Sequence, residues 1–70
     1  MIEISRLDPD KDVGKWVEYK DFRGVEKGRI KSWSRDVIFV VYRCNNEWHR
    51  FTDFTGVATS PEDLNFVKES

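Results

Sequence analysis

The chain lacks the features of a secreted or membrane-bound protein. Its single cysteine, Cys44, can form no internal disulfide bond, which is typical of a protein kept in a reducing compartment. No stretch approaches the roughly 18 consecutive apolar residues that a membrane-spanning helix needs. The first residues have neither the basic head nor the apolar segment of a secretory signal. We therefore expect a cytoplasmic location and no membrane partner.

The chain also has few residues suited to catalysis or metal binding. One histidine, His49, and one cysteine are too few for a zinc site. The run Asp8-x-Asp10-x-Asp12 lacks the glycine and the final glutamate of a calcium loop, and predicts a solvated turn instead. No spacing of serine, histidine and aspartate predicts a catalytic triad, and the glycines are scattered. The sequence predicts no cofactor, no metal and no enzymatic activity.

A strong excess of positive charge is absent as well. The net charge is −1, whereas proteins that bind nucleic acids over their whole surface are usually basic. The charges are nevertheless uneven, because residues 20–35 contain six cations and two acids, while both flanks are acidic. Only a local basic stripe is therefore available for contacts with phosphate.

Alternating apolar and polar residues, separated by turn signals, are what the chain does contain. Its 70 residues suffice for one small domain, and ten aromatic side chains are available to fill the core. The period of two predicts strands, and a helical turn is expected from Ser60, because proline and acids follow it. We expect Val17, Ile30, Val40, Tyr42 and Leu64 in the core. The predicted strands cover residues 13–20, 25–34, 37–43, 47–54 and 65–67.

Five short strands with a one-turn helix before the last strand predict an all-β fold. The expected architecture is a small five-stranded Src-homology-3-like barrel, since closure removes exposed strand edges. Residues 1–12 show little periodicity and are expected to form an irregular N-terminal arm. Residues 13–68 are expected to form the single barrel domain.

Several motifs carry a resemblance to a known group. They are Val13-Gly14…Val17-Glu18-Tyr19, Gly28-Arg29-Ile30-Lys31-Ser32, Val37-Ile38-Phe39-Val40-Val41-Tyr42, Trp48…Phe51…Phe54-Thr55 and Ala58-Thr59…Pro61-Glu62-Asp63-Leu64…Phe66. In these motifs the chain resembles small, uncharacterised phage and prophage proteins, which implies a Src-homology-3-like barrel and the cytoplasm of a bacterial host. A weaker likeness is to KOW and Tudor modules. Gly28 and Ile30 match the KOW pattern, but Gly24 lies one position too early, and no four-residue aromatic cage of the Tudor type is evident.

Cations interleaved with aromatic residues supply the candidate binding surface. Alternation predicts one strand face that carries Lys27, Arg29, Lys31 and Trp33, beside a basic loop. Cations can neutralise phosphates and aromatic rings can stack on bases; the competing interpretation is a solvated face whose long side chains cover apolar surface. The candidate binding residues are Trp16, Lys20, Phe22, Arg23, Lys27, Arg29, Lys31, Trp33 and Trp48.

Two functions follow as expectations. The first is a non-enzymatic binding module that recognises a host or phage protein through an aromatic groove or a sheet edge, including action as an inhibitor of that protein. The alternative is nucleic-acid binding through the basic second strand and the adjoining loop. The sequence predicts neither the identity of the partner nor the oligomeric state.

Overall fold

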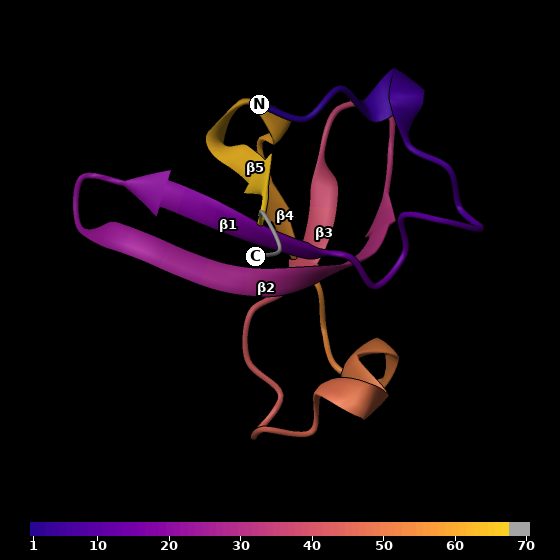
Figure 1. Cartoon of the computed structure of the whole chain (residues 1–70), viewed down its shortest axis with the longest axis vertical. Helices are drawn as coiled ribbons and strands as arrows, with labels where there is room; N and C mark the ends of the chain where they lie inside the picture. The colour runs from indigo at the N-terminus through magenta and orange to yellow at the C-terminus, as the bar shows by residue number, and fades with distance from the viewer. Residues whose placement is uncertain (68–70) are drawn as a thin grey trace.

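Five strands form one antiparallel sheet in the computed structural model, which describes residues 1–67 (Figure 1). The order β4-β3-β2-β1-β5 means that β1 to β4 follow one another across the sheet and β5 returns to pair with β1. The strands are β1 (Trp16–Asp21), β2 (Gly24–Trp33), β3 (Ile38–Val41), β4 (Val57–Thr59) and β5 (Leu64–Phe66).

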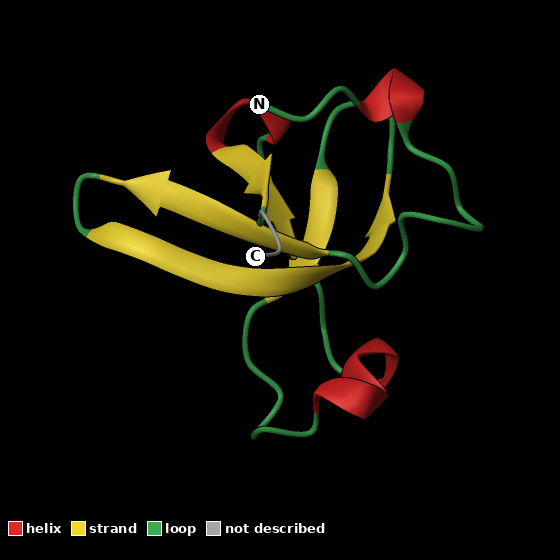
Figure 2. Ribbon diagram, viewed as in Figure 1, coloured by secondary structure: helices red, strands yellow, loops and turns green. Residues whose placement is uncertain are grey.

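Residues 1–67 also contain three short 3-10 segments, one before β1 and two between later strands, and Figure 2 shows them in red against the yellow sheet. They are η1 (Ile4–Arg6), η2 (Trp48–Asp53) and η3 (Pro61–Asp63). The predicted all-β class is confirmed, as is the single helical turn before the last strand. Within residues 1–67 the ladders end at β4 and β5, so closure into a barrel remains a prediction. The expected domain limit at residue 68 lies outside the described residues.

The core lies on one face of the sheet and follows the predicted alternation. Val17, Ile30, Val40 and Leu64 are fully buried, as expected, whereas Tyr42 is half-buried and packs against them. The first residues contribute as well, because Ile2 is only 4% exposed and its backbone N–H donates to the carbonyl oxygen of Pro61 at 3.0 Å. The N-terminal segment is thereby packed onto the end of the sheet that carries η3.

The predicted strand over residues 47–54 is wrong, because this segment contains η2. Trp48, Arg50, Thr52 and Phe54 alternate as in a strand, but Trp48 and Phe51 are spaced by three residues. η2 consists of short 3-10 turns joined at Arg50, whose φ of −115° and ψ of 26° are not helical. This path of the chain places Trp48 against Trp16 and Phe51 against Arg29. The fourth strand is instead the three-residue β4, which is too short for its periodicity to be recognised.

Two other strand boundaries differ from the prediction for local reasons. The first strand begins at Trp16 rather than Val13, because residues 9–14 form turns and Gly14 has a φ of +89°. The third strand ends at Val41, and a turn follows in which Asn45 and Asn46 have φ values of 52° and 65°. Asparagine tolerates this left-handed conformation better than most residues.

The β1–β2 hairpin extends beyond its neighbours in the sheet. β5 pairs with β1 only as far as Tyr19, and β3 pairs with β2 only from Arg29 onward. The hairpin end therefore projects from the body of the sheet as a two-stranded arm (Figure 1). Phe22 is 94% exposed at the tip, and Gly24 closes the turn with a φ of +135°, which L side chains rarely adopt.

Asp12 supplies a prediction about acid stability. Its carboxylate lies 2.9 Å from Lys15 Nζ and accepts a hydrogen bond from the backbone N–H of Asp8. The hydrogen bond from Lys15 and that from Asp8 hold the pKa of Asp12 below its ordinary value of 3.8. Because the charged form is favoured in the folded state, this stabilisation is complete above pH 3.8 and is lost as the pH falls through the lower folded value.

We expect the variant Asp12→Asn to be less stable than the wild type at neutral pH, and this difference to shrink below pH 3.8. Urea unfolding across the acidic range measures the difference. The matched control is Asp10→Asn, which removes an exposed carboxylate from the same turn. A stability difference between Asp12→Asn and the wild type that is constant with pH would contradict the assignment.

Candidate functional site

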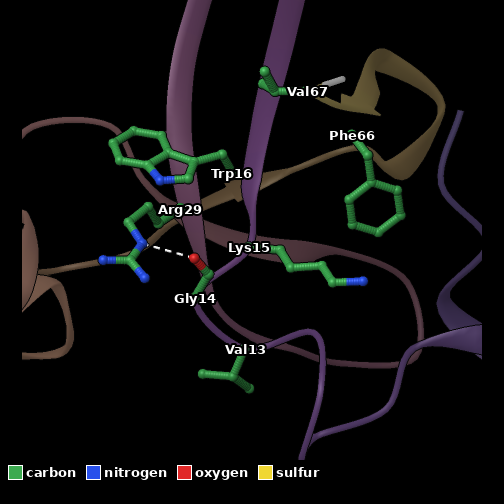
Figure 3. A pocket seen from close by; sticks show the side chains of 7 residues that line it. All are labelled: Val13, Gly14, Lys15, Trp16, Arg29, Phe66 and Val67. Atoms are coloured by element: carbon green, nitrogen blue, oxygen red, sulfur yellow. Dashed lines mark hydrogen bonds between the residues drawn. The ribbon is translucent and has the colours of Figure 1, made fainter. Parts of the chain in front are cut away.

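Arg29 is at the centre of a cluster that joins three parts of the chain. Its Nε donates to the carbonyl oxygen of Gly14 at 2.7 Å (Figure 3), and its Nη1 donates to that of Trp48 at 2.8 Å. The guanidinium carbon lies 4.4 Å from the centroid of the Phe51 ring and 5.5 Å from that of Trp16. No carboxylate forms an ion pair with Arg29 within residues 1–67. Arg29 therefore fixes the turn before β1 and the segment after β3 against β2.

The basic stripe of β2 consists of Lys27, Arg29, Lys31 and Trp33. Some of its side chains are held by contacts within the chain, and others are exposed to solvent. Lys31, like Arg29, is held by a loop, because its Nζ donates to the carbonyl oxygen of Phe54 at 2.8 Å. A β-bulge between Ile30 and Ser32 shifts the register, and Trp33 packs against the core instead of lying beside Lys31. Lys27 remains exposed on the projecting part of the hairpin. The structure therefore does not bring the four stripe residues onto one open face.

The other predicted binding residues fall into two groups. Trp16 and Trp48 meet in the Arg29 cluster, with ring centroids 4.6 Å apart. Lys20, Phe22 and Arg23 lie near the hairpin tip, where Arg23 forms an ion pair with Asp21 at 3.4 Å and Lys20 lies 3.9 Å from Glu18. The two groups are at opposite ends of the same hairpin.

A hollow of about 600 Å³ opens beside Trp16 (Figure 3). Trp16 is 38% exposed and Phe66 is 42% exposed, and the figure places the Trp16 ring on one side of β1 and the Phe66 ring, together with the Lys15 side chain, on the other. Lys15 Nζ lies 5.4 Å from the centroid of the Phe66 ring. The hollow therefore combines two accessible aromatic rings with the cations Lys15 and Arg29.

A second hollow, which we call the tyrosine groove, has a volume of about 730 Å³. Tyr19 and Tyr42 meet edge to face in it, with ring centroids 6.4 Å apart, and the hydroxyls of Tyr42 and Thr59 are hydrogen-bonded at 2.9 Å. Burial raises the pKa of Tyr42 above 10.0, so its hydroxyl is neutral at physiological pH. The groove is lined by Tyr19, Glu26, Tyr42, Arg43, Thr55, Val57, Ala58, Thr59, Ser60 and Asp63.

The tyrosine groove lies beside a sheet edge. β4 supplies Val57, Ala58 and Thr59 to its wall, and among residues 1–67 this strand is paired only with β3. Val57 is 53% exposed, and Ala58 is exposed as well. An apolar, accessible strand with one unpaired side is a template for pairing with another extended chain.

Sequence reasoning missed the residues of the tyrosine groove. Tyr19 and Tyr42 are 23 positions apart, and only the pairing of β1, β2 and β3 brings them together. The signal in the sequence is a tyrosine on each of two predicted strands, but alternation predicts only a core position for Tyr42 and not its place in the groove.

Within the described residues, the remaining chemical groups are dispersed. No group of three or more histidine, cysteine, aspartate or glutamate side chains there could hold a metal ion. His49 is exposed on η2, and Cys44 is buried as a free thiol. None of the helices in residues 1–67 has both the length and the apolar character needed to cross a membrane.

The geometry defines a small all-β chain whose surface includes the hollow beside Trp16 and the tyrosine groove. Comparison with protein-family models, with curated proteins and with solved structures gives no match. The functional argument therefore depends on the two hollows and the residues that line them.

Proposed function

We propose that the chain is a non-enzymatic binding module that holds an extended segment of a partner protein in the tyrosine groove. The observation that carries the proposal is the position of this aromatic groove beside the unpaired side of β4. An added strand gains main-chain hydrogen bonds from a sheet edge, while a neighbouring groove selects its side chains. The groove and the edge together supply both parts of this mode of recognition.

The lining of the groove indicates the side chains that it would accept. The faces of Tyr19 and Tyr42 offer a wall for an apolar or aromatic side chain. Glu26 and Asp63 outnumber the one cation, Arg43, so a lysine or arginine of the partner would be favoured at the rim. We therefore expect an extended segment that combines an apolar side chain with a basic one.

The alternative function, nucleic-acid binding through the basic stripe of β2, has less support. Binding to phosphate requires accessible cations, but Arg29 and Lys31 donate to carbonyl oxygens of the chain itself. Trp33, the expected stacking residue, packs against the core. The resemblance to phage proteins makes a bacterial lysate the appropriate source of the partner, and inhibition of that partner stays part of the proposal.

The test is capture of a partner from bacterial lysate by the immobilised chain, with and without nuclease treatment. Mass spectrometry would identify the captured protein, and titration with the purified protein would measure its affinity. The double variant Glu26→Lys/Asp63→Lys reverses the charge of the rim at two exposed positions. We expect it to bind the partner at least about tenfold more weakly, since each rim contact to a charge is worth roughly 1 kcal/mol.

The matched control is Glu3→Lys/Glu62→Lys, which makes the same change in net charge outside the groove. This control should keep the affinity of the wild type, and urea unfolding should show that both variants are folded. Loss of the captured protein after nuclease treatment would contradict the proposal. So would equal weakening of binding by the groove variant and by the control.

A further inference from the structure

The two faces of the β1–β2 hairpin carry different groups. Tyr19 pairs with Glu26, and both line the tyrosine groove. The preceding pair, Glu18 with Lys27, points to the opposite face, because successive side chains of a strand alternate. A ligand on this second face would therefore not compete for the residues of the tyrosine groove.

Two neighbouring hollows border this part of the hairpin. The hollow beside Trp16 adjoins another of about 610 Å³, and the two share Phe66 and Val67 in their walls. We call the joined hollows the cationic groove. Its charged lining consists of the cations Lys15, Lys20, Lys27 and Arg29 and the single acid Glu18.

Local ion pairs neutralise only part of this positive charge. Lys15 is paired with Asp12 at 2.9 Å, and Lys20 lies 3.9 Å from Glu18. Neither Lys27 nor Arg29 forms an ion pair with any carboxylate of residues 1–67. The groove therefore keeps a local excess of positive charge in a chain whose net charge is −1.

Two accessible aromatic rings border the cationic groove. Trp16 is 38% exposed, although one side of its ring packs near Trp48 and the Arg29 guanidinium. Phe66 is 42% exposed and borders both hollows. Cations that follow a groove, together with aromatic rings on which bases stack, are the combination that binds single-stranded nucleic acids.

We propose that the cationic groove binds a short segment of single-stranded nucleic acid. Lys20 and Lys27 contact phosphates, and a base stacks on Trp16 or Phe66. A single strand fits because its bases are free to stack, whereas those of a duplex are already stacked on one another. An acidic peptide would satisfy the cations but would leave the two aromatic rings without a defined role.

The experiment is a titration of the full chain with a fluorescein-labelled oligothymidylate, followed by anisotropy. A length of about ten nucleotides lies within the site sizes of comparable single-strand grooves. We expect saturable binding at micromolar concentrations in low salt. Two phosphate contacts predict a slope of about −1.4 for log K against log salt concentration. The absence of saturable binding would overturn the proposal.

Variants separate the contribution of phosphate contacts to binding from that of base stacking. Lys27→Gln should weaken binding and reduce the salt slope by about 0.7, the value for one phosphate contact. Phe66→Ala and Trp16→Ala should together weaken binding by about tenfold or more without changing the slope. The control Arg35→Gln removes an exposed cation outside the groove and should change neither quantity.

Two competitors test the class of ligand. A polyglutamate peptide of similar length should displace the oligonucleotide only weakly, and a duplex of the same length should bind less tightly than the single strand. Displacement by polyglutamate at equal concentration would assign the groove to acidic peptides and overturn the proposal. Tighter binding of the duplex, or equal weakening by Lys27→Gln and Arg35→Gln, would overturn it as well.

Discussion

Truncation of Leu64 to alanine is expected to lower the free energy of unfolding by about 2–5 kcal/mol. Leu64 is fully buried and follows η3 directly, at the point where the chain turns into β5. Its removal leaves a cavity among Val17, Ile30 and Val40, which belong to the same core cluster. A domain of this size has only about 5–10 kcal/mol of stability, so the loss would be a large fraction of the total.

Urea unfolding followed by tryptophan fluorescence measures the effect of Leu64→Ala. The matched control is Val25→Ala, which shortens a side chain that is 54% exposed on the hairpin arm. We expect the control to change stability by less than about 1 kcal/mol. A loss below about 1 kcal/mol for Leu64→Ala would mean that the residue does not fill the core.

Gly28→Ala is expected to destabilise the chain by at least about 2 kcal/mol, in the upper part of the range for overpacked sites. A Cβ atom at this position would lie 2.6 Å from Val40 Cγ1 and 2.6 Å from the carbonyl oxygen of Val41. A side chain can rotate away from such a contact, whereas a backbone carbonyl of a paired strand cannot. β2 and β3 would therefore have to separate locally.

A double variant tests which contact is responsible. Val40→Ala removes the methyl group near Gly28 but leaves the Val41 carbonyl in place. Because Val40 is also a core residue, the comparison includes Val40→Ala alone, and we expect the losses of stability from the two single substitutions to add in Gly28→Ala/Val40→Ala, as measured by urea unfolding. Rescue by the second substitution would show that the side-chain contact dominates, and a neutral effect of Gly28→Ala would contradict the close approach itself.

The sequence predicts the fold best where one physical signal is strong and local. Leu64 is a clear example, because serine, proline and two acids before it indicate a helical turn that must end in the core. Gly28 is another, because a glycine inside a strand pattern indicates a bend or a close approach of backbone. In both places the neighbouring residues in the chain determine the local structure.

Prediction fails where distant residues decide the local conformation. The residues of η2 alternate as in a strand, and only the distant residues Trp16 and Arg29, on which Trp48 and Phe51 pack, favour the kinked 3-10 conformation instead. The bulge after Ile30 is set by the ladder between β2 and β3, so the position of Trp33 could not be read from alternation.

The candidate site was harder to predict than the fold. The cations and aromatic residues of β1 and β2 were identified, but alternation cannot show that Arg29 and Lys31 are held by loop carbonyls. Their partners, Gly14, Trp48 and Phe54, are between 15 and 23 positions away. The tyrosine groove depends in the same way on strand pairing.

The pairing of β1 with β5 has a consequence for the kinetics of folding. Val17 is paired with Phe66, so the ladder joins segments at almost opposite ends of the sequence. Such contacts require a long loop to close before they contribute energy, which slows folding. During synthesis on the ribosome, the β1–β2 hairpin can form early, but one side of β1 stays open until β5 has emerged. Until then the growing chain exposes an unpaired strand to other proteins in the cell.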